Sequence, residues 1–269
     1  MLPAIVKVRE TRLVQVIRIN NVESHDMRKL LTTIFFVLTL TMSGQQSKEW
    51  IRLINNPKYD IDRLRIEDFK ADYYMYDFSK LMIPHYDFIG FIGSNYRRIR
   101  ITFTSITKSS VNIGTYLVKG FSLVGNNKCD FSGEIAIDQI RVYKNMHFGT
   151  DDEYKNQGIK KQGVLIGKYE FKENPTKLES GVFAGVMTLY WYLDRHGVIC
   201  YDDIEISCSD RYCNNQYVGT WLKYGADKGK VCNWGELRIP FSGDLDNGSA
   251  EFSPNPKYLK MGWDNLELF

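Results

Sequence analysis

The feature that most constrains the fold is an alternation of apolar and polar residues. In RRIRITFTSI, residues 97–106, the side chains of Ile99, Ile101 and Phe103 fall on one face, and arginine and threonine side chains fall on the other. Successive side chains of a β-strand point to opposite faces of the sheet. The segment therefore predicts a strand with one buried face and one solvated face.

Seven further segments of strand-like composition follow at hairpin spacing. They cover residues 115–124, 131–143, 162–171, 180–193, 198–206, 216–224 and 231–239. Glycines at 120, 167, 185 and 219 fall inside them, where glycine commonly marks a bulge or a sharp bend. No long helical pattern of the kind that joins parallel strands lies between the segments. We therefore expect a mainly β fold, a single antiparallel β-barrel or sandwich of about eight strands.

The strands belong to one domain. Nothing between residues 88 and 245 has the composition of a linker, so residues 85–269 are assigned to a single antiparallel β domain. Residues 45–84 precede it as a short irregular or partly helical segment. Its aromatic run from Tyr73 to Phe78 suits an extended chain as well as a helix.

Residues 27–44, MRKLLTTIFFVLTLTMSG, predict an export signal. The cations Arg28 and Lys29 precede a thirteen-residue apolar core, which ends at the small residues Ser43 and Gly44. A membrane anchor needs about 20 apolar residues, so the core is too short to be one. We therefore expect an exported protein, periplasmic or extracellular, and we treat residues 1–26 as an upstream extension.

The net charge excludes one class of partner. The whole chain carries +3. Residues 1–26 contribute +1 and the signal contributes +2, so residues 45–269 carry no net charge. A nucleic-acid-binding domain needs a basic surface, and we therefore expect no nucleic-acid partner. Charges on both faces of the strands also indicate a protein that does not span the membrane once the signal is removed.

Five cysteines, all from position 129 onward, agree with an oxidising compartment. Their spacing matches no zinc site, and an odd number leaves at least one thiol unpaired. Similar turn-like settings favour a Cys129–Cys232 disulfide, and proximity favours Cys208–Cys213. Spacing alone does not fix the connectivity, and five reduced, packed cysteines are the alternative.

Motifs for known chemistry are missing from the sequence. It has no phosphate-binding loop, no dinucleotide fingerprint, no HExxH and no GxSxG, so we expect no cofactor. SGDLDNGSAE, residues 242–251, resembles a calcium loop, but it is one residue too short and lacks flanking helices, so we expect a turn and no metal. Asp203 and Glu205 would share a strand face, as paired glycosidase carboxylates require, or simply form a solvated strand end.

Aromatic residues offer the other candidate site. Tyr190 and Tyr192 share one face of a predicted strand, and Trp221 and Trp234 flank the turn GADKGK. A hairpin centred between residues 227 and 228 would place the two indoles directly opposite each other. Such aromatics form either a platform for a ligand or the filling of a barrel interior.

Several stretches resemble uncharacterised exported proteins of Bacteroides-type bacteria. They include FIGFIGSNYRRIRITFTSI, YLVKGFSLVGNNKCDFSGEI and NNQYVGTWLKYGADKGKVCNWGELRIPFSGDLD, and the resemblance spans roughly residues 85–255. It implies an exported antiparallel β domain and Cys129 with Cys232 as the older cysteine pair, and it carries over no catalytic residue.

Two functions follow as hypotheses. The first is a cell-envelope binding module for a glycan, a lipid or a protein, with Tyr190, Tyr192, Trp221 and Trp234 as ligand-binding residues. The alternative is a secreted or periplasmic polysaccharide hydrolase that uses Asp203 and Glu205.

Overall fold

The structure, a computed structural model, describes residues 45–55, 67–204, 212–248 and 251–264. All of them belong to one compact unit, Ser43–Phe269. The upstream extension 1–26 and the signal 27–44 lie outside the described residues, as do Glu205 and Cys208.

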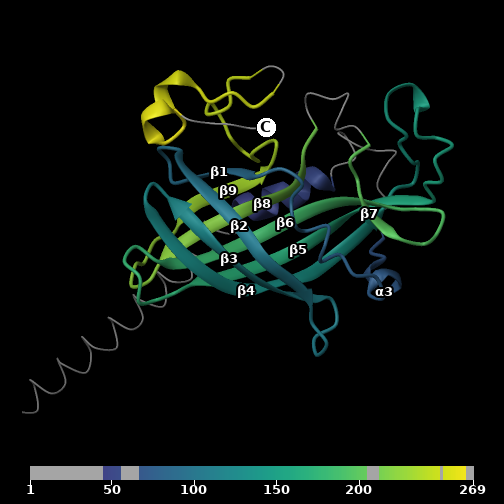
Figure 1. Ribbon diagram of the computed structural model, residues 1–269, viewed down its shortest axis with the longest axis horizontal. Helices are drawn as coiled ribbons and strands as arrows, with labels where there is room; N and C mark the ends of the chain where they lie inside the picture. The colour runs from purple at the N-terminus through teal and green to yellow at the C-terminus, as the bar shows by residue number, and fades with distance from the viewer. Residues whose placement is uncertain (1–44, 56–66, 205–211, 249–250, 265–269) are drawn as a thin grey trace, which may run out of the picture. The chain divides into compact units, whose positions relative to one another are not determined.

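Nine antiparallel strands form one sheet. They are β1 (Phe88–Ile92), β2 (Arg97–Lys108), β3 (Thr115–Val124), β4 (Asn127–Val142), β5 (Lys161–Glu173), β6 (Gly181–Leu193), β7 (Ile199–Tyr201), β8 (Asn214–Lys223) and β9 (Lys230–Glu236). The sheet order is β5-β4-β3-β2-β1-β9-β8-β6-β7, and β5 also pairs with β6. This last pairing closes eight strands into a barrel, with β7 as a short additional strand on β6 (Figure 1). The predicted mainly β antiparallel fold is confirmed.

Two members of the predicted strand set differ from the observed one. Strand β1, FIGFI, was not among the predicted strands because every one of its residues is buried, so its sequence does not alternate. Within the described residues 198–204, the predicted strand 198–206 forms a strand over Ile199–Tyr201. The closed barrel nevertheless has eight strands. It includes β1, which was not predicted, and β7 lies outside the closed ring.

Helices are few in the described residues. Residues 45–54 are helical, and α3 (Lys70–Tyr73) is a single turn. The 3-10 segments are η1 (Thr150–Asp152) and η2 (Pro256–Met261). The segment before the barrel is thus irregular and partly helical where the structure describes it.

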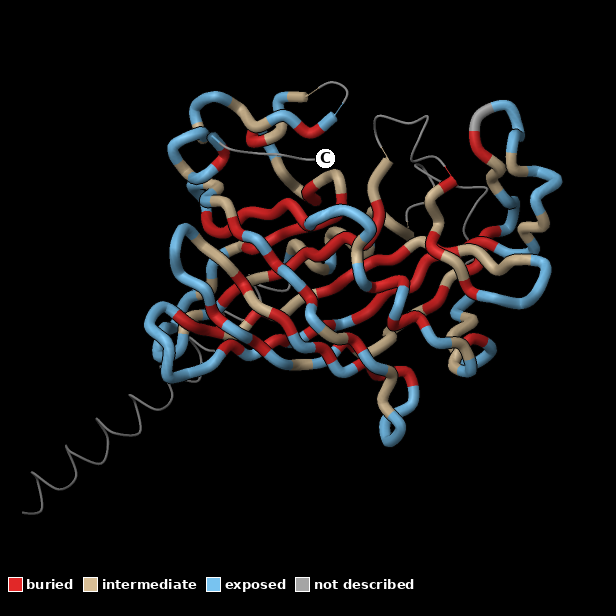
Figure 2. The backbone as a smooth tube through the Cα atoms, viewed as in Figure 1, coloured by how far each residue is buried: buried red, intermediate tan, exposed pale blue. Residues whose placement is uncertain are grey.

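Aromatic side chains fill the interior of the barrel. Buried residues recur along the barrel strands (Figure 2). Tyr217 and Trp234 face each other across the β8–β9 ladder and stack with ring centroids 4.9 Å apart. Tyr169 packs edge-on against both rings, at 5.5 and 5.3 Å. Its hydroxyl lies over the opposed pair Gly185 and Gly219, where a Cβ would approach within 2.9 and 2.5 Å. These two glycines therefore make the room that the Tyr169 ring occupies.

The other two interior glycines mark bulges, as predicted. Gly120 on β3 pairs with Phe103, where the β2 register shifts, and Gly167 on β5 pairs with Ile137, where the β4 register shifts. Bulges increase the local bend of a strand. They therefore help the sheet to curl into a closed barrel.

A buried glutamate fastens one end of the barrel. Glu173, the last residue of β5, accepts hydrogen bonds from the Ser122 hydroxyl on β3, from the Gly181 N–H on β6 at 2.8 Å, and from Trp221 Nε1 on β8 at 2.8 Å. One carboxylate thus connects four strands, and its buried charge is compensated by three donors.

Residues 67–87 close the other end. Tyr73, Phe78, Leu81 and Met82 from this segment are buried in the barrel core. The hydroxyl of Tyr116, on β3, accepts the backbone N–H of Phe78 at 3.1 Å. Burial raises the pKa of Tyr116 to about 12, so the phenol stays neutral. The segment acts as a plug.

Two further segments cover the outside of the barrel. In the helix formed by residues 45–54, Gln46 accepts a hydrogen bond from Asn233, and Ser47 donates to the carbonyl of Val218. The C-terminal segment covers β1, where Ile89 and Phe91 join a second core that includes Trp263. This cover explains why β1 is buried on both faces.

The predicted Cys129–Cys232 disulfide is wrong, because both are free thiols. The two cysteines lie on β4 and β9, which three other strands separate in the sheet order. Both are buried, and burial raises the pKa of each thiol. Cys213 is a free thiol as well, and Cys208, its predicted partner, lies outside the described residues.

Replacing Glu173 with alanine should destabilise the barrel strongly. Three donors lose their acceptor, and a buried donor left unsatisfied costs about 1–3 kcal/mol, so we expect a loss of at least about 2 kcal/mol in urea unfolding. Glu170→Ala is the control, since it removes only an exposed ion pair with Lys172 on the same strand. That change should cost less than about 1 kcal/mol. Equal losses in the two variants would contradict the role of Glu173.

Candidate functional site

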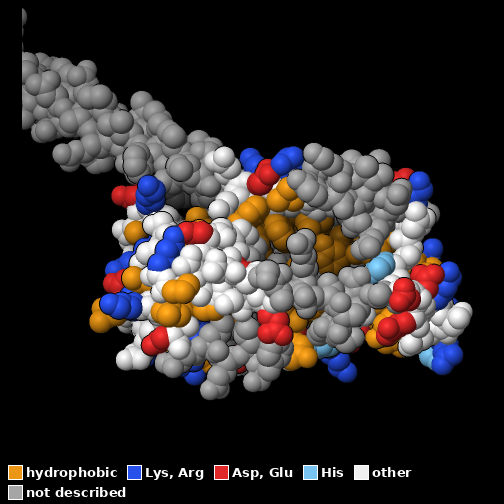
Figure 3. All heavy atoms as spheres, turned by 90° about the horizontal axis from the view of Figure 1, so that it is seen from above, with side chains coloured by type: hydrophobic (Ala, Val, Ile, Leu, Met, Phe, Trp, Pro, Cys, Tyr) orange, Lys and Arg blue, Asp and Glu red, His pale blue; other side chains and the backbone are white. Residues whose placement is uncertain are grey.

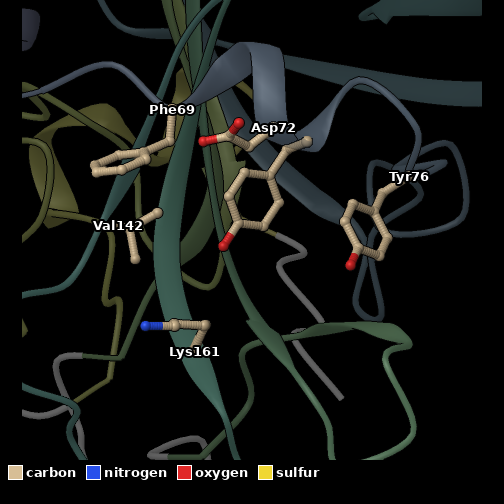
Figure 4. A pocket seen from close by; sticks show the side chains of 6 residues that line it. Phe69, Asp72, Tyr76, Val142 and Lys161 are labelled. Atoms are coloured by element: carbon tan, nitrogen blue, oxygen red, sulfur yellow. The ribbon is translucent and has the colours of Figure 1, made fainter.

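A half-open pocket lies where the plug meets the barrel. Its volume is about 290 Å³, and it is lined by Phe69, Asp72, Tyr73, Tyr76, Val142 and Lys161 (Figure 4). Four of these residues come from the plug, and Val142 and Lys161 are the last residue of β4 and the first of β5. The volume is at the lower end for small-molecule sites, which suits one ring-sized group.

The plug is held in place by hydrogen bonds to the backbone of β4. The N–H of Phe69 donates to the carbonyl of Ile140 at 2.8 Å, and the Asp68 carboxylate accepts the N–H of Ile140 at 3.0 Å. Lys70 donates to the carbonyl of Asp138 at 3.0 Å. These bonds place α3 beside β4 and so fix the position of Asp72 at the pocket.

Aromatic rings make up one part of the lining. Tyr73 packs on Trp191 with ring centroids 4.7 Å apart and lies 5.6 Å from the ring of Tyr76. Burial raises the pKa of Tyr73, so its hydroxyl remains a neutral donor and acceptor. Lys108 donates to the carbonyl of Tyr76 at 2.7 Å and fixes that turn of the plug. The aromatic wall is therefore held in place before any ligand binds.

Two opposite charges complete the lining. Asp72 comes from α3 and Lys161 from β5, and both side chains are exposed (Figure 4). Within the described part of the chain, neither of them forms an ion pair. The pocket thus offers one carboxylate acceptor and one ammonium donor beside aromatic rings.

The four aromatics named from the sequence do not form one site. Trp221 and Trp234 are buried inside the barrel, whereas Tyr190 and Tyr192 are half-buried on the outward face of β6. Trp191, between the two tyrosines, points inward and is fully buried. Neighbouring residues of a strand point to opposite faces of the sheet. The two tyrosines therefore lie on the outer face of β6, and the tryptophans lie in the barrel interior.

The predicted register of the last hairpin is wrong. Trp234 faces Tyr217, and Trp221 faces Lys230, so the two indoles are not directly opposed. The turn is centred at Gly225 and Ala226, two residues earlier than predicted, and Gly225 has the positive φ of 76° that allows it. The residue opposite Trp221 is Lys230, an even number of positions from the predicted Trp234. Both indoles therefore still lie on one face of the sheet, as predicted. That face is the inner one.

Of the two carboxylates in the hydrolase hypothesis, the structure describes one. Asp203 is half-buried beyond β7 and is not among the residues that line the pocket, and Glu205 lies outside the described residues. In the loop of residues 242–251, Asp246 pairs with Arg238 at 2.6 Å and accepts the N–H of Gly248. Among the described residues, no group of three or more histidine, cysteine or acidic side chains has the arrangement of a metal site.

A second buried glutamate lies at the same end of the barrel as the pocket. Glu236 is fully buried, and one oxygen accepts the backbone N–H groups of His85 and Tyr86, each at 2.9 Å. The other oxygen accepts the Tyr201 hydroxyl at 2.5 Å. Burial raises the pKa of Glu236, and the hydrogen bonds oppose this shift. Since three donors occupy the carboxylate, its role is to fix the plug to β7 and β9.

Sequence reasoning missed every residue that lines the pocket. The aromatic run from Tyr73 to Phe78 was the only signal, because such a run next to predicted strands supplies rings that have to pack somewhere. Asp72 and Lys161 are 89 positions apart in number and have no local motif. Only the docking of the plug brings them together.

Seen from above, the molecule also has a hollow in which hydrophobic side chains gather (Figure 3). Acidic and basic side chains are interspersed over the rest of that face. The described residues on that face therefore form no large surface of a single charge sign.

The fold and the pocket define a closed antiparallel barrel with a plugged end and a small charged aromatic site. Comparison with protein-family models, curated proteins and solved structures finds no match for the chain. Among the described residues, no helix is long and apolar enough to cross a bilayer.

The raised pKa of Glu236 predicts a pH dependence of stability. The unfolded chain loses this proton near the ordinary value of 4.5, whereas the folded chain holds it to a higher pH. Between the two values the folded state binds more protons, so the free energy of unfolding falls as pH rises. Glu236→Gln should remove this component, because glutamine does not titrate. Its stability should fall less than that of the wild type between about pH 4.5 and 8, as measured by urea unfolding.

His85 interacts with the same carboxylate, so wild type and the Glu236→Gln variant are also compared when each carries His85→Gln. An identical pH dependence with and without the Glu236→Gln change would contradict the prediction.

Proposed function

We propose that the protein is an exported binding module of the cell envelope and that it holds a glycan in the pocket at the plugged end of the barrel. The composition of the pocket lining carries the proposal. Asp72 and Lys161, which form no ion pair among the described residues, lie beside three aromatic rings. These rings belong to Phe69, Tyr73 and Tyr76. Sugar hydroxyls both donate and accept hydrogen bonds, and the C–H face of a sugar ring packs on aromatic rings. The lining supplies a partner for each of these groups.

The same features favour a glycan over the other two ligand classes. A lipid tail needs an apolar channel, whereas this pocket is small and has two charged groups at its lining. A stable protein partner buries about 1,200–2,000 Å² of total surface, far more than a pocket of this size provides. A half-open pocket holds one sugar unit and leaves the rest of a chain in solvent.

Binding is also favoured over hydrolysis. Glycosidases place two carboxylates on either side of the scissile bond. The pocket contains one carboxylate, Asp72, and the nearby Glu236 already accepts three hydrogen bonds. Hydrolysis by Asp203 and Glu205 stays a prediction.

Export is supported by the sequence of residues 27–44 and by the helical segment that follows. Gln46, Ser47 and Trp50 each form a hydrogen bond with the barrel. A chain cut before Gln45 keeps all of these contacts. The proposed cleavage site is therefore compatible with the folded barrel.

The pocket proposal predicts that Asp72→Asn and Tyr76→Ala weaken glycan binding. Glycans are screened on immobilised arrays with residues 45–269, and the affinity for any hit is measured by calorimetry. Loss of the carboxylate removes a charge-assisted hydrogen bond worth about 1.5–3 kcal/mol, so the affinity should fall about 10- to 100-fold. Asp227→Asn is the matched control, since Asp227 is exposed in the β8–β9 turn at the opposite end of the barrel. Equal binding by Asp72→Asn and the control would contradict the pocket as the glycan site.

Processing gives a separate prediction. Protein recovered from its host should begin within a residue or two of Gln45, because the small residues Ser43 and Gly44 precede it. Intact-mass measurement checks this outcome. A soluble protein that retains residues 27–44 would contradict export.

A further inference from the structure

Trp191 has a buried hydrogen-bond donor without a partner. The residue is fully buried, and its indole Nε1 has no hydrogen-bond acceptor among the described residues. Leaving a buried polar group unpaired costs free energy, so native proteins pair nearly all of them. An unpaired donor next to a pocket is therefore a candidate partner for a ligand.

The unpaired donor belongs to a residue that contacts the pocket lining, since the Trp191 ring packs against Tyr73. The indole edge that carries the nitrogen lies over Gly163, where an added Cβ would approach Cε2 within 3.1 Å. Gly163 is paired with Val142 on β4, and it shares the inner face of β5 with Lys161. The Tyr73 ring packs on the same indole at a tilt of 51°. Three pocket-lining residues are thus close to Trp191 in the fold. Tyr73 contacts its ring, Val142 lies opposite Gly163, and Lys161 precedes Gly163 on β5, where Gly163 is the residue that pairs with Trp191.

Of these three neighbours, Lys161 is the exposed one. Tyr73 and Val142 are buried and fixed by their packing. Changes of side-chain rotamer are common on binding, and Lys161 has the most freedom to make one. A ligand would reach the indole N–H through such a movement of Lys161.

We propose that the inner end of the pocket binds a carboxylate, held by the Lys161 ammonium and the Trp191 indole N–H, and that the ligand is an acidic sugar, a hexuronic acid unit. The inference rests on the proposed glycan function and names its substrate class. Two donors, one of them charged, come from the paired strands β5 and β6 at this end of the barrel, and a carboxylate has two oxygens to accept them. Asp72, on α3, accepts the hydroxyls of the sugar ring.

The probes are D-galacturonic acid and D-glucuronic acid, with D-galactose and D-glucose as neutral counterparts that differ only at C6. Affinities of the full protein are measured by isothermal titration calorimetry. Wild type should bind each acid about 10- to 100-fold more tightly than its neutral counterpart, the scale of a charge-assisted hydrogen bond. Lys161→Met should abolish most of this preference.

Trp191→Phe keeps the ring and removes the N–H. It should weaken binding of the acids about 3- to 10-fold, the scale of one neutral hydrogen bond, and leave the neutral sugars unchanged. Trp234→Phe is the matched control, because Trp234 is also fully buried with an unpaired Nε1 but does not line or border the pocket. Lys228→Met, in the β8–β9 turn, controls for loss of one positive charge. Melting temperatures show whether each variant is folded.

The outcomes separate the two proposals. If wild type binds neutral and acidic sugars equally, or if Trp191→Phe and Trp234→Phe bind the acids alike, the carboxylate site is overturned and glycan binding in the pocket stands. If L-glutamate binds as tightly as the uronic acids, the pocket recognises a carboxylate on another ligand, and the sugar assignment is overturned. If no glycan on the array binds, the proposed function itself fails.

Discussion

The ladder between β5 and β6 is the constraint on which the rest of the structure depends. It runs from Lys161 opposite Leu193 to Lys172 opposite Val182 and turns an open sheet into a barrel. Without it, β5 and β6 would each present unpaired backbone groups along an edge. An eight-stranded barrel has an interior just wide enough for side chains to fill. Closure therefore decides how much space the interior has and which residues fit there.

Aromatic packing follows from that narrow interior. The rings of Tyr169, Tyr217 and Trp234 occupy the centre, and Gly185 and Gly219 supply the space that a Cβ would have taken. Buried carboxylates then fasten both ends, Glu173 across four strands and Glu236 between the plug and the barrel. The interior is filled, and Trp221 and Trp234, two of the aromatic residues that suggested a binding platform in the sequence, are part of this core. The concave site lies at the end, where the plug leaves part of the barrel mouth uncovered.

Prediction from the sequence succeeded where a local pattern carried the information. Alternation in residues 97–106 identified β2, and glycines 120 and 167 marked bulges. Prediction failed for β1 because the C-terminal segment packs on the outer face of this strand. Both faces of β1 are then buried, so its sequence has no alternation of apolar and polar residues. The predicted β8–β9 register was wrong because the turn residues GADKGK allow more than one turn centre. In the tertiary structure the turn is centred at Gly225 and Ala226. The Cys129–Cys232 disulfide failed because similar local sequences do not imply nearby positions in a closed sheet.

The sequence by itself determined the class of fold, the face on which most strand residues lie and the zero net charge of residues 45–269, because each depends on composition or on a period of two. Only the tertiary structure decided how the barrel closes, which aromatics are core, and where the pocket forms. Asp72, Lys161 and Trp191 come from the plug, from β5 and from β6, and no local pattern connects them. They meet because closure brings β5 beside β6 and because backbone hydrogen bonds place the plug across that end. A site made by such long-range contacts has no signature in one stretch of sequence.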